Sequence, residues 1–142
     1  MKPGDKVLSL EANQAWAKRI YQKLLIVAPD LWEISEYAKS RVEGYMDLNL
    51  DVLIAAKGYR RIALSHYWKH DSGDMIPDPD MEIGVYRDWE MAEALTYQDM
   101  WSYDDVYSGP DGQVDRRHYL HCNAFLEKWL EALAEQGHLL RK

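Results

Sequence analysis

The chain has 142 residues, of which 47% are hydrophobic, so it is long enough to enclose one hydrophobic core and too short for two. Its 24 acidic and 17 basic residues give a formal net charge of −7, which disfavours direct binding to nucleic acid because phosphate contacts need clustered lysine and arginine. No apolar run approaches the roughly 18 residues that cross a bilayer, the N-terminus lacks the apolar segment of a secretory signal, and Cys122 is the only cysteine. We therefore predict a single cytoplasmic domain over residues 1–142, with neither a membrane nor nucleic acid as its direct partner.

The N-terminal part predicts two helices. From Leu10 to Val27, apolar residues recur at helical spacing, and Pro29 then ends the pattern. Asp30 is placed to cap a short second helix that reaches Tyr37.

The hydrophobic period changes to two after Gly44, which indicates strands. In Met46–Ile54 apolar residues alternate with Asp47, Asn49 and Asp51, and Arg61–Lys69 continues the alternation beyond a turn at Gly58, so the two segments predict a hairpin. Met81–Trp89 and Met91–Tyr97 are the third and fourth predicted strands. Pro77 and Pro79 are expected to hold the segment before the third strand extended but outside any hydrogen-bonded ladder.

The last helix is the strongest pattern in the chain. Asp115 is predicted to cap a helix over His118–Gln136, and Gly137 is predicted to end it. Its apolar positions follow helical spacing and are Cys122, Phe125, Leu126, Trp129, Leu130 and Leu133. The element order predicts an α+β fold, with an antiparallel meander sheet of about four strands and with the N-terminal helices and the long C-terminal helix packed on one face.

The stretch from Asp71 to Asp115 concentrates acidic and aromatic residues. It holds thirteen acids against a single base, Arg87, whereas the rest of the chain is close to neutral or basic. This composition is typical of a surface that contacts a protein or a cation, so we predict a non-enzymatic interaction protein with a basic or nucleic-acid-binding protein partner, which it could engage as a nucleic-acid mimic. The predicted binding residues are Asp78, Asp80, Trp89, Trp101, Tyr103, Asp104 and Asp105.

Two alternatives remain open. The first is a hydrolase-like enzyme that uses carboxylates with His66, with or without a divalent metal. On a strand, His66 and His70 lie about 13 Å apart, too far for one ion, although a hairpin could fold Asp80 or Glu82 back beside His66. The second is a homodimer formed through the aromatic residues. No spacing singles out a catalytic residue, and no metal or other cofactor is predicted.

Cys122 admits two interpretations. His118 and His121 lie near it in the sequence, so the thiol could act as a nucleophile. It also falls on the apolar stripe of the last helix, and we interpret it as a buried core thiol. The chain has no Gly-rich phosphate loop, no nucleophile elbow and no C-x-x-C pair.

Several segments resemble the YqiB-like family, a bacterial domain of unknown function. They cover about four fifths of the chain and are YQKLLIVAPDLWEI (21–34), YMDLNLDVL (45–53), His66-Tyr67, Gly73-Asp74, PDPDMEIGVY (77–86), MAEALTYQ (91–98) and NAFLEKWLEALAEQGH (123–138). Relatives often carry Tyr-His-Asp where this chain has Tyr86-Arg87-Asp88, which disfavours a catalytic role for that tripeptide. The same holds for Arg116-Arg117-His118, where relatives often carry Asp-Glu-Lys. The resemblance implies no activity.

Overall fold

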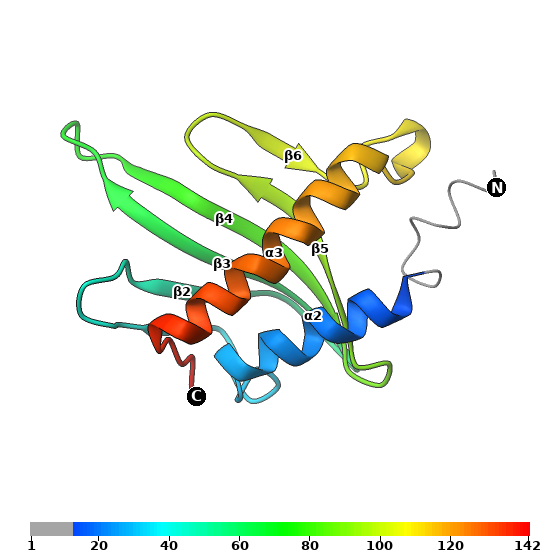
Figure 1. The fold of residues 1–142 in the computed structure, drawn as a ribbon, viewed down its shortest axis with the longest axis horizontal. Helices are drawn as coiled ribbons and strands as arrows, with labels where there is room; N and C mark the ends of the chain where they lie inside the picture. Colours follow the sequence, from blue (N-terminus) through cyan, green and yellow to red (C-terminus); the bar gives the residue numbers. More distant parts are fainter. Residues whose placement is uncertain (1–12) are drawn as a thin grey trace.

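The computed structural model describes residues 13–142, in which two α-helices pack on one face of a six-stranded antiparallel sheet (Figure 1). In chain order, the elements are α2 (Gln14–Val27), β1 (Tyr37–Ser40), β2 (Leu48–Ala56), β3 (Tyr59–Lys69), β4 (Met75–Tyr86), β5 (Met91–Gln98), β6 (Tyr103–Asp105), the 3-10 turn η1 (Pro110–Gly112) and α3 (Arg116–Gln136). The first three residues of the predicted N-terminal helix lie outside the described residues. Neither described helix is both long and apolar enough to cross a membrane.

The sheet is a meander, because its strand order is the chain order and every neighbouring pair is antiparallel. Gly58 and Gly73 make two of the tight turns with φ of 72° and 94°, a backbone region that glycine enters without steric cost. The predicted α+β fold is therefore confirmed, with six strands rather than about four. The two additional strands, β1 and β6, have four and three residues, too few for an alternating pattern to reveal them.

The short helix predicted from Asp30 to Tyr37 is wrong. The carbonyl of Asp30 accepts hydrogen bonds from the amides of Glu33 and Ile34, but this turn does not continue. Instead, Tyr37 begins β1, which pairs with β2 from Tyr37↔Asp51 to Ser40↔Leu48. A helix of eight residues is marginal by itself, and here the segment forms turns up to Tyr37, the one residue of it that joins the ladder at the sheet edge.

A bulge in β2 changes which side chains are buried. Leu48 and Leu50 face the helices as predicted, but the register with β3 shifts between Val52 and Ile54. One extra residue reverses the side-chain alternation beyond it, so Ile54, expected on the buried face, is 47% exposed.

The expectation that Pro77 and Pro79 lie outside any ladder is wrong for Pro77. Both belong to β4, where Pro77 pairs with Tyr67 and Asp80 pairs with Ser65, whereas Pro79 lies in the irregularity between these two pairs and has no partner in the ladder. The pairing of β4 with β5 begins only at Asp80, so the proline segment borders a single strand. Proline lacks an amide hydrogen and is tolerated where one side of a strand has no partner.

The core lies between the sheet and the two helices, and α3 supplies much of it. The Asp115 carboxylate accepts a hydrogen bond from the His118 amide at 2.9 Å, and Gly137 ends the helix with φ of 91°, so both predicted helix ends are confirmed. The buried Asn123 side chain joins α3 to the sheet, because its Oδ1 accepts from the Ala94 amide at 2.9 Å.

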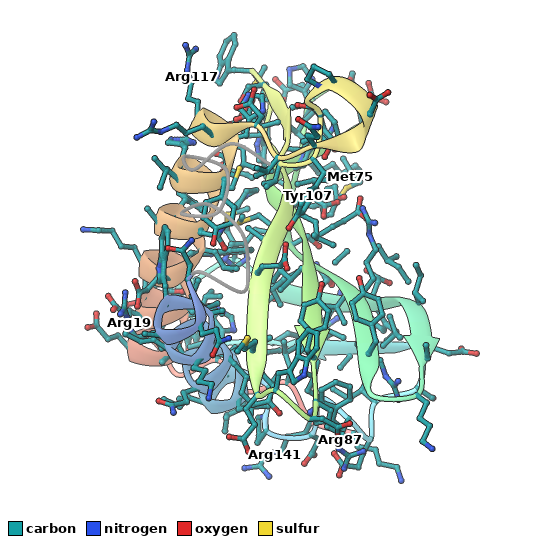
Figure 2. All side chains as sticks on the ribbon, turned by 90° about the vertical axis from the view of Figure 1, so that its right-hand side faces the viewer. Arg19, Met75, Arg87, Tyr107, Arg117 and Arg141 are labelled. Carbon is teal, nitrogen blue, oxygen red and sulfur yellow. The ribbon has the colours of Figure 1, made fainter. Side chains whose placement is uncertain are left out.

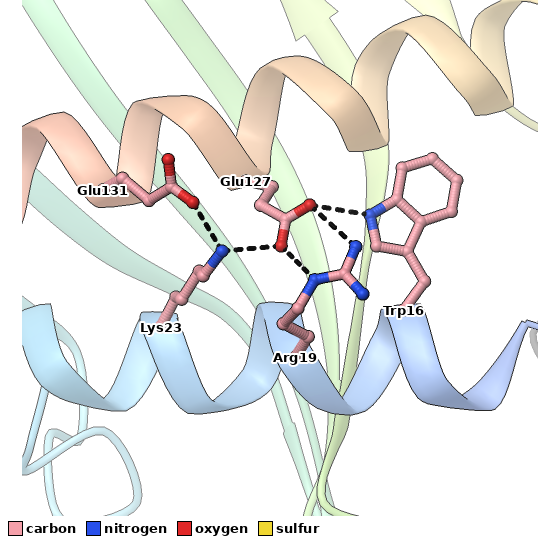
Figure 3. A network of polar contacts seen from close by, with 5 residues as sticks. All are labelled: Trp16, Arg19, Lys23, Glu127 and Glu131. Atoms are coloured by element: carbon pink, nitrogen blue, oxygen red, sulfur yellow. Dashed lines mark hydrogen bonds and ion pairs between the residues drawn. The ribbon is translucent and has the colours of Figure 1, made fainter.

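An ion-pair network joins the two helices on their outer side (Figure 3). Glu127 of α3 accepts from the Trp16 indole at 3.2 Å, from Arg19 and from Lys23, all of which belong to α2. Lys23 also contacts Glu131, one turn further along α3. Arg19 and Lys23 together hold the pKa of Glu127 at about 2, below its usual value.

Candidate interaction surface

The sheet has one face that neither described helix covers. In Figure 2 both helices lie on one side of the strands and Met75 lies on the other. Strand alternation and register place mainly polar and aromatic residues on the side that the helices leave uncovered. We call this side of the sheet the open face. The open face includes Tyr37, Lys39, Asn49, Asp51, Tyr59, Arg61, Ser65, Tyr67, Lys69, Met75, Asp80, Glu82, Tyr86, Glu93, Thr96, Gln98, Tyr103 and Asp105.

A groove of about 340 Å³ crosses the open face over β1, β2 and β3. Its lining residues are Tyr37, Lys39, Asn49, Asp51, Ser65, Tyr67 and Met75. Two tyrosines are held in place by hydrogen bonds: the Tyr37 hydroxyl donates to Asn49 Oδ1 at 2.6 Å, and the Tyr67 hydroxyl donates to the Asp80 carboxylate. The groove thus combines fixed aromatic rings with carboxylates.

Asp51, which lines the groove, and Asp80, which lies beyond β3, repel each other. Asp51 pairs with Ala63 and Asp80 pairs with Ser65, so the two carboxylates flank β3 on the same side of the sheet. Partial burial raises the pKa of Asp51, and the negative charge of Asp80 raises it further. A cation placed between them would relieve that repulsion.

Only some of the charged side chains on the open face form ion pairs. Arg61 Nε donates to Glu82 at 2.7 Å, which neutralises Glu82 locally. Among residues 13–142, no basic side chain forms an ion pair with Asp51 or Asp80. Asp51 and Asp80 are therefore carboxylates without an ion-pair partner among the described residues, although Lys39 also lines the groove.

Glu93 is a buried carboxyl group on the open face. It is 3% exposed and accepts hydrogen bonds from the hydroxyls of Tyr86 and Tyr107. Burial raises the pKa of Glu93, and the two tyrosine hydrogen bonds offset only part of that effect. The same burial, together with the Glu93 charge, raises the pKa of Tyr86 and of Tyr107.

We expect the contribution of Glu93 to the free energy of unfolding to fall as the pH rises. The folded pKa lies above the unfolded one, so the folded state binds more protons, and the free energy of unfolding decreases with pH between those two values. Glu93→Gln keeps an acceptor for the tyrosines but cannot titrate, so the pH dependence that Glu93 adds to the free energy of unfolding should vanish. Urea unfolding from pH 4.5 to pH 8 would measure it, with Glu43→Gln, a change at an exposed loop residue, as the control. Parallel pH profiles for wild type and Glu93→Gln would contradict the assignment.

The residues predicted for binding do not gather in one place. Trp89 and Trp101, the latter 86% exposed, lie beyond opposite ends of β5, a strand about 23 Å long. Asp80, Tyr103 and Asp105 lie on the open face, whereas Asp104 faces α3, where its carboxylate is 3.4 Å from His118 Nε2. Asp78 is exposed in β4. Their role in binding stays a prediction.

His66 lies on the other side of the sheet from Asp80 and Glu82, so these two carboxylates do not lie beside it. The ring contacts Trp129 at 5.4 Å and His138 at 5.9 Å between ring centroids, and Nδ1 is 2.8 Å from the Asp47 carbonyl oxygen. His66 is therefore a buried core residue. The hairpin does form, but alternation directs Asp80 and Glu82 away from the helices.

Sequence reasoning missed most of the groove. Asp51, Tyr67 and Lys39 lie outside or before the acidic stretch that carried the prediction, and no local pattern joins them. The available signal was the polar half of the strand alternation, since Asn49 and Asp51 occupy the positions between the buried leucines of β2.

Comparison with known proteins identifies a family and no function. A family model described as a protein of unknown function, DUF1249, matches residues 23–139. No curated protein and no solved structure matches the chain. The matched segment runs from the middle of α2 to just beyond the end of α3 and includes the whole sheet. The chain therefore belongs to the DUF1249 family.

Proposed function

We propose that this protein is a non-enzymatic interaction module that binds a basic segment of a protein partner on the open face. The observation that carries the proposal is the pair Asp51 and Asp80, which flank the groove beside Tyr67 without a basic partner among the described residues. A lysine or arginine side chain of the partner would relieve the repulsion between the two carboxylates.

The aromatic residues around the groove suit this role. Tyrosine is enriched at protein interfaces because its ring buries a large area and its hydroxyl still forms hydrogen bonds. Tyr37 and Tyr67 are already held by hydrogen bonds, so little side-chain entropy is lost when a partner binds. Tyr103 extends the same face to β6.

We also propose that the protein acts in the bacterial cytoplasm. The resemblance to YqiB-like proteins and the single free thiol support a bacterial, cytoplasmic protein. An acidic face that receives a basic segment also suits a nucleic-acid-binding partner, whose groove it would occupy in place of phosphates. Trp89 and Trp101 would then contact the partner beyond the two ends of β5.

The proposal predicts charge-dependent binding of a basic peptide. Fluorescein-labelled decalysine should bind the full chain, whereas labelled decaglutamate should not, and affinity should fall as salt rises to about 0.15 M, where the Debye length is about 8 Å. Asp51→Asn combined with Asp80→Asn should weaken decalysine binding about tenfold, equivalent to about 1.4 kcal/mol. Fluorescence anisotropy titrations would measure both effects.

A matched double variant separates the effect of the open face on binding from the effect of the overall negative charge. Asp111→Asn with Glu135→Gln removes the same formal charge from exposed positions in η1 and on α3, neither of which lines the groove, so it should change decalysine affinity less than twofold. Equal losses in the two double variants would refute the open-face proposal. Sedimentation of the unliganded chain tests the homodimer alternative, which requires a mass of two chains.

A further inference from the structure

A second cluster of polar side chains lies on the helix side of the sheet, where β6 meets the start of α3. Asp104 faces this helix, and α3 presents His118, His121 and Cys122 from its first two turns. These helix positions have i, i+3 and i+4 spacing and therefore share a face. One oxygen, nitrogen or sulfur atom from each of Asp104, His121 and Cys122 lies within 4.8 Å of the other two.

His118 lies beside this cluster and contacts Asp104, but its ring nitrogens are not within 4.8 Å of all three other ligand atoms. Its Nε2 is 3.4 Å from Asp104 Oδ1, and its Nδ1 is 3.1 Å from the Asp105 carbonyl oxygen and 3.7 Å from the Asp115 carboxylate. A neutral ring that donates from Nδ1 to the Asp105 carbonyl has its Nε2 lone pair directed toward an Asp104 oxygen. A proton on Nε2 or a cation between the two atoms makes this approach favourable, and its length is compatible with the roughly 3.4 Å that separates ligands of a tetrahedral zinc ion.

The surroundings favour a divalent cation. Asp104, Asp105 and Asp115 place three carboxylates near the cluster. Their negative charge attracts a metal ion, and a metal ion that binds the Cys122 sulfur displaces the thiol proton. Cys122 is fully buried and His121 is exposed, so an ion could enter from the His121 side.

We propose that Asp104, His118, His121 and Cys122 form a zinc site that fastens β6 to α3. Thiolate and imidazole ligands select zinc over magnesium and calcium, and four protein ligands describe a closed, structural site. Side-chain rotations of the four residues would have to shorten their separations, which are within 4.8 Å for Asp104, His121 and Cys122, to the spacing that zinc requires. The carbonyl of Asp105 orients His118 as such carbonyls orient ligating histidines elsewhere. The site is independent of the open face.

Cobalt substitution tests the proposal. Tag-free full-length protein, treated with chelator, should bind one Co²⁺ per chain with the spectrum of a tetrahedral site and a thiolate-to-cobalt charge-transfer band. Zn²⁺ should displace the cobalt and raise the melting temperature. Cys122→Ser should abolish the charge-transfer band, and His121→Ala and Asp104→Asn should each weaken Co²⁺ binding at least tenfold.

Two controls keep the outcome interpretable. His70→Ala, in the exposed β3–β4 turn, should leave the cobalt spectrum and affinity unchanged. Exposed His121 can be replaced without opening a core cavity, so the metal-free His121→Ala protein should melt like wild type. Absence of saturable Co²⁺ binding, or a charge-transfer band that survives Cys122→Ser, would overturn the site. Asp51→Asn with Asp80→Asn should not affect Co²⁺ binding, which separates this test from that of the open face.

Discussion

Replacing Trp129 by alanine is expected to lower the free energy of unfolding by about 3–5 kcal/mol, the usual range for truncating a buried large aromatic side chain. Trp129 is 8% exposed and lies in the layer between α3 and the sheet. Its ring contacts His66 of β3 and Phe125 of the preceding helical turn. The truncation would leave a cavity where helix and sheet meet, and urea unfolding monitored by far-ultraviolet circular dichroism would measure the loss.

Trp101→Ala is the matched control for this prediction. It removes the same side chain from the turn between β5 and β6, where it is 86% exposed, so the free energy of unfolding should change by less than about 0.5 kcal/mol. An unchanged free energy of unfolding in Trp129→Ala would show that α3 is not packed through this residue.

Glu127→Gln is expected to lower the free energy of unfolding by about 2 kcal/mol at pH 7. The pKa of Glu127 falls from its usual 4.5 to about 2 because Arg19 and Lys23 donate to it and attract its charge. Each pKa unit corresponds to about 1.4 kcal/mol, and we discount the total because Arg19 is half exposed to solvent. The folded pKa lies below the unfolded one, so this stabilisation is present above about pH 5 and is lost as pH falls toward 2.

Unfolding free energies at pH 7, 5 and 3 would therefore converge for wild type and Glu127→Gln as the pH falls. Glu131→Gln provides the comparison on the same helix face, because Glu131 is half exposed and contacts only Lys23 among the described residues. Its replacement should cost less than about 1 kcal/mol, as is typical for an exposed ion pair. A constant difference between wild type and Glu127→Gln across this pH range would contradict the assigned linkage.

The sequence by itself determined the fold class and the long elements. The apolar stripe from Cys122 to Leu133, the cap at Asp115 and the stop at Gly137 predicted α3, because helix periodicity and capping depend on residues close together in the chain. Alternation likewise predicted β2 to β5, since a strand with one buried face records that burial at every second residue. The amino-acid composition also identified the acidic stretch that contains Asp80, Tyr103 and Asp105.

Only the tertiary structure decided which side of the sheet each side chain faces and which distant residues meet. The bulge after Val52 and the pairing of β1 and β6 depend on hydrogen bonds between strands, which leave little trace in a single segment. For the same reason the sequence suggested His66 with Asp80, which lie on opposite faces. Asp51 approaches Asp80 across β3, and Asp104 approaches Cys122 across the gap between β6 and α3. Each pair is far apart along the chain, so packing alone brings its members together.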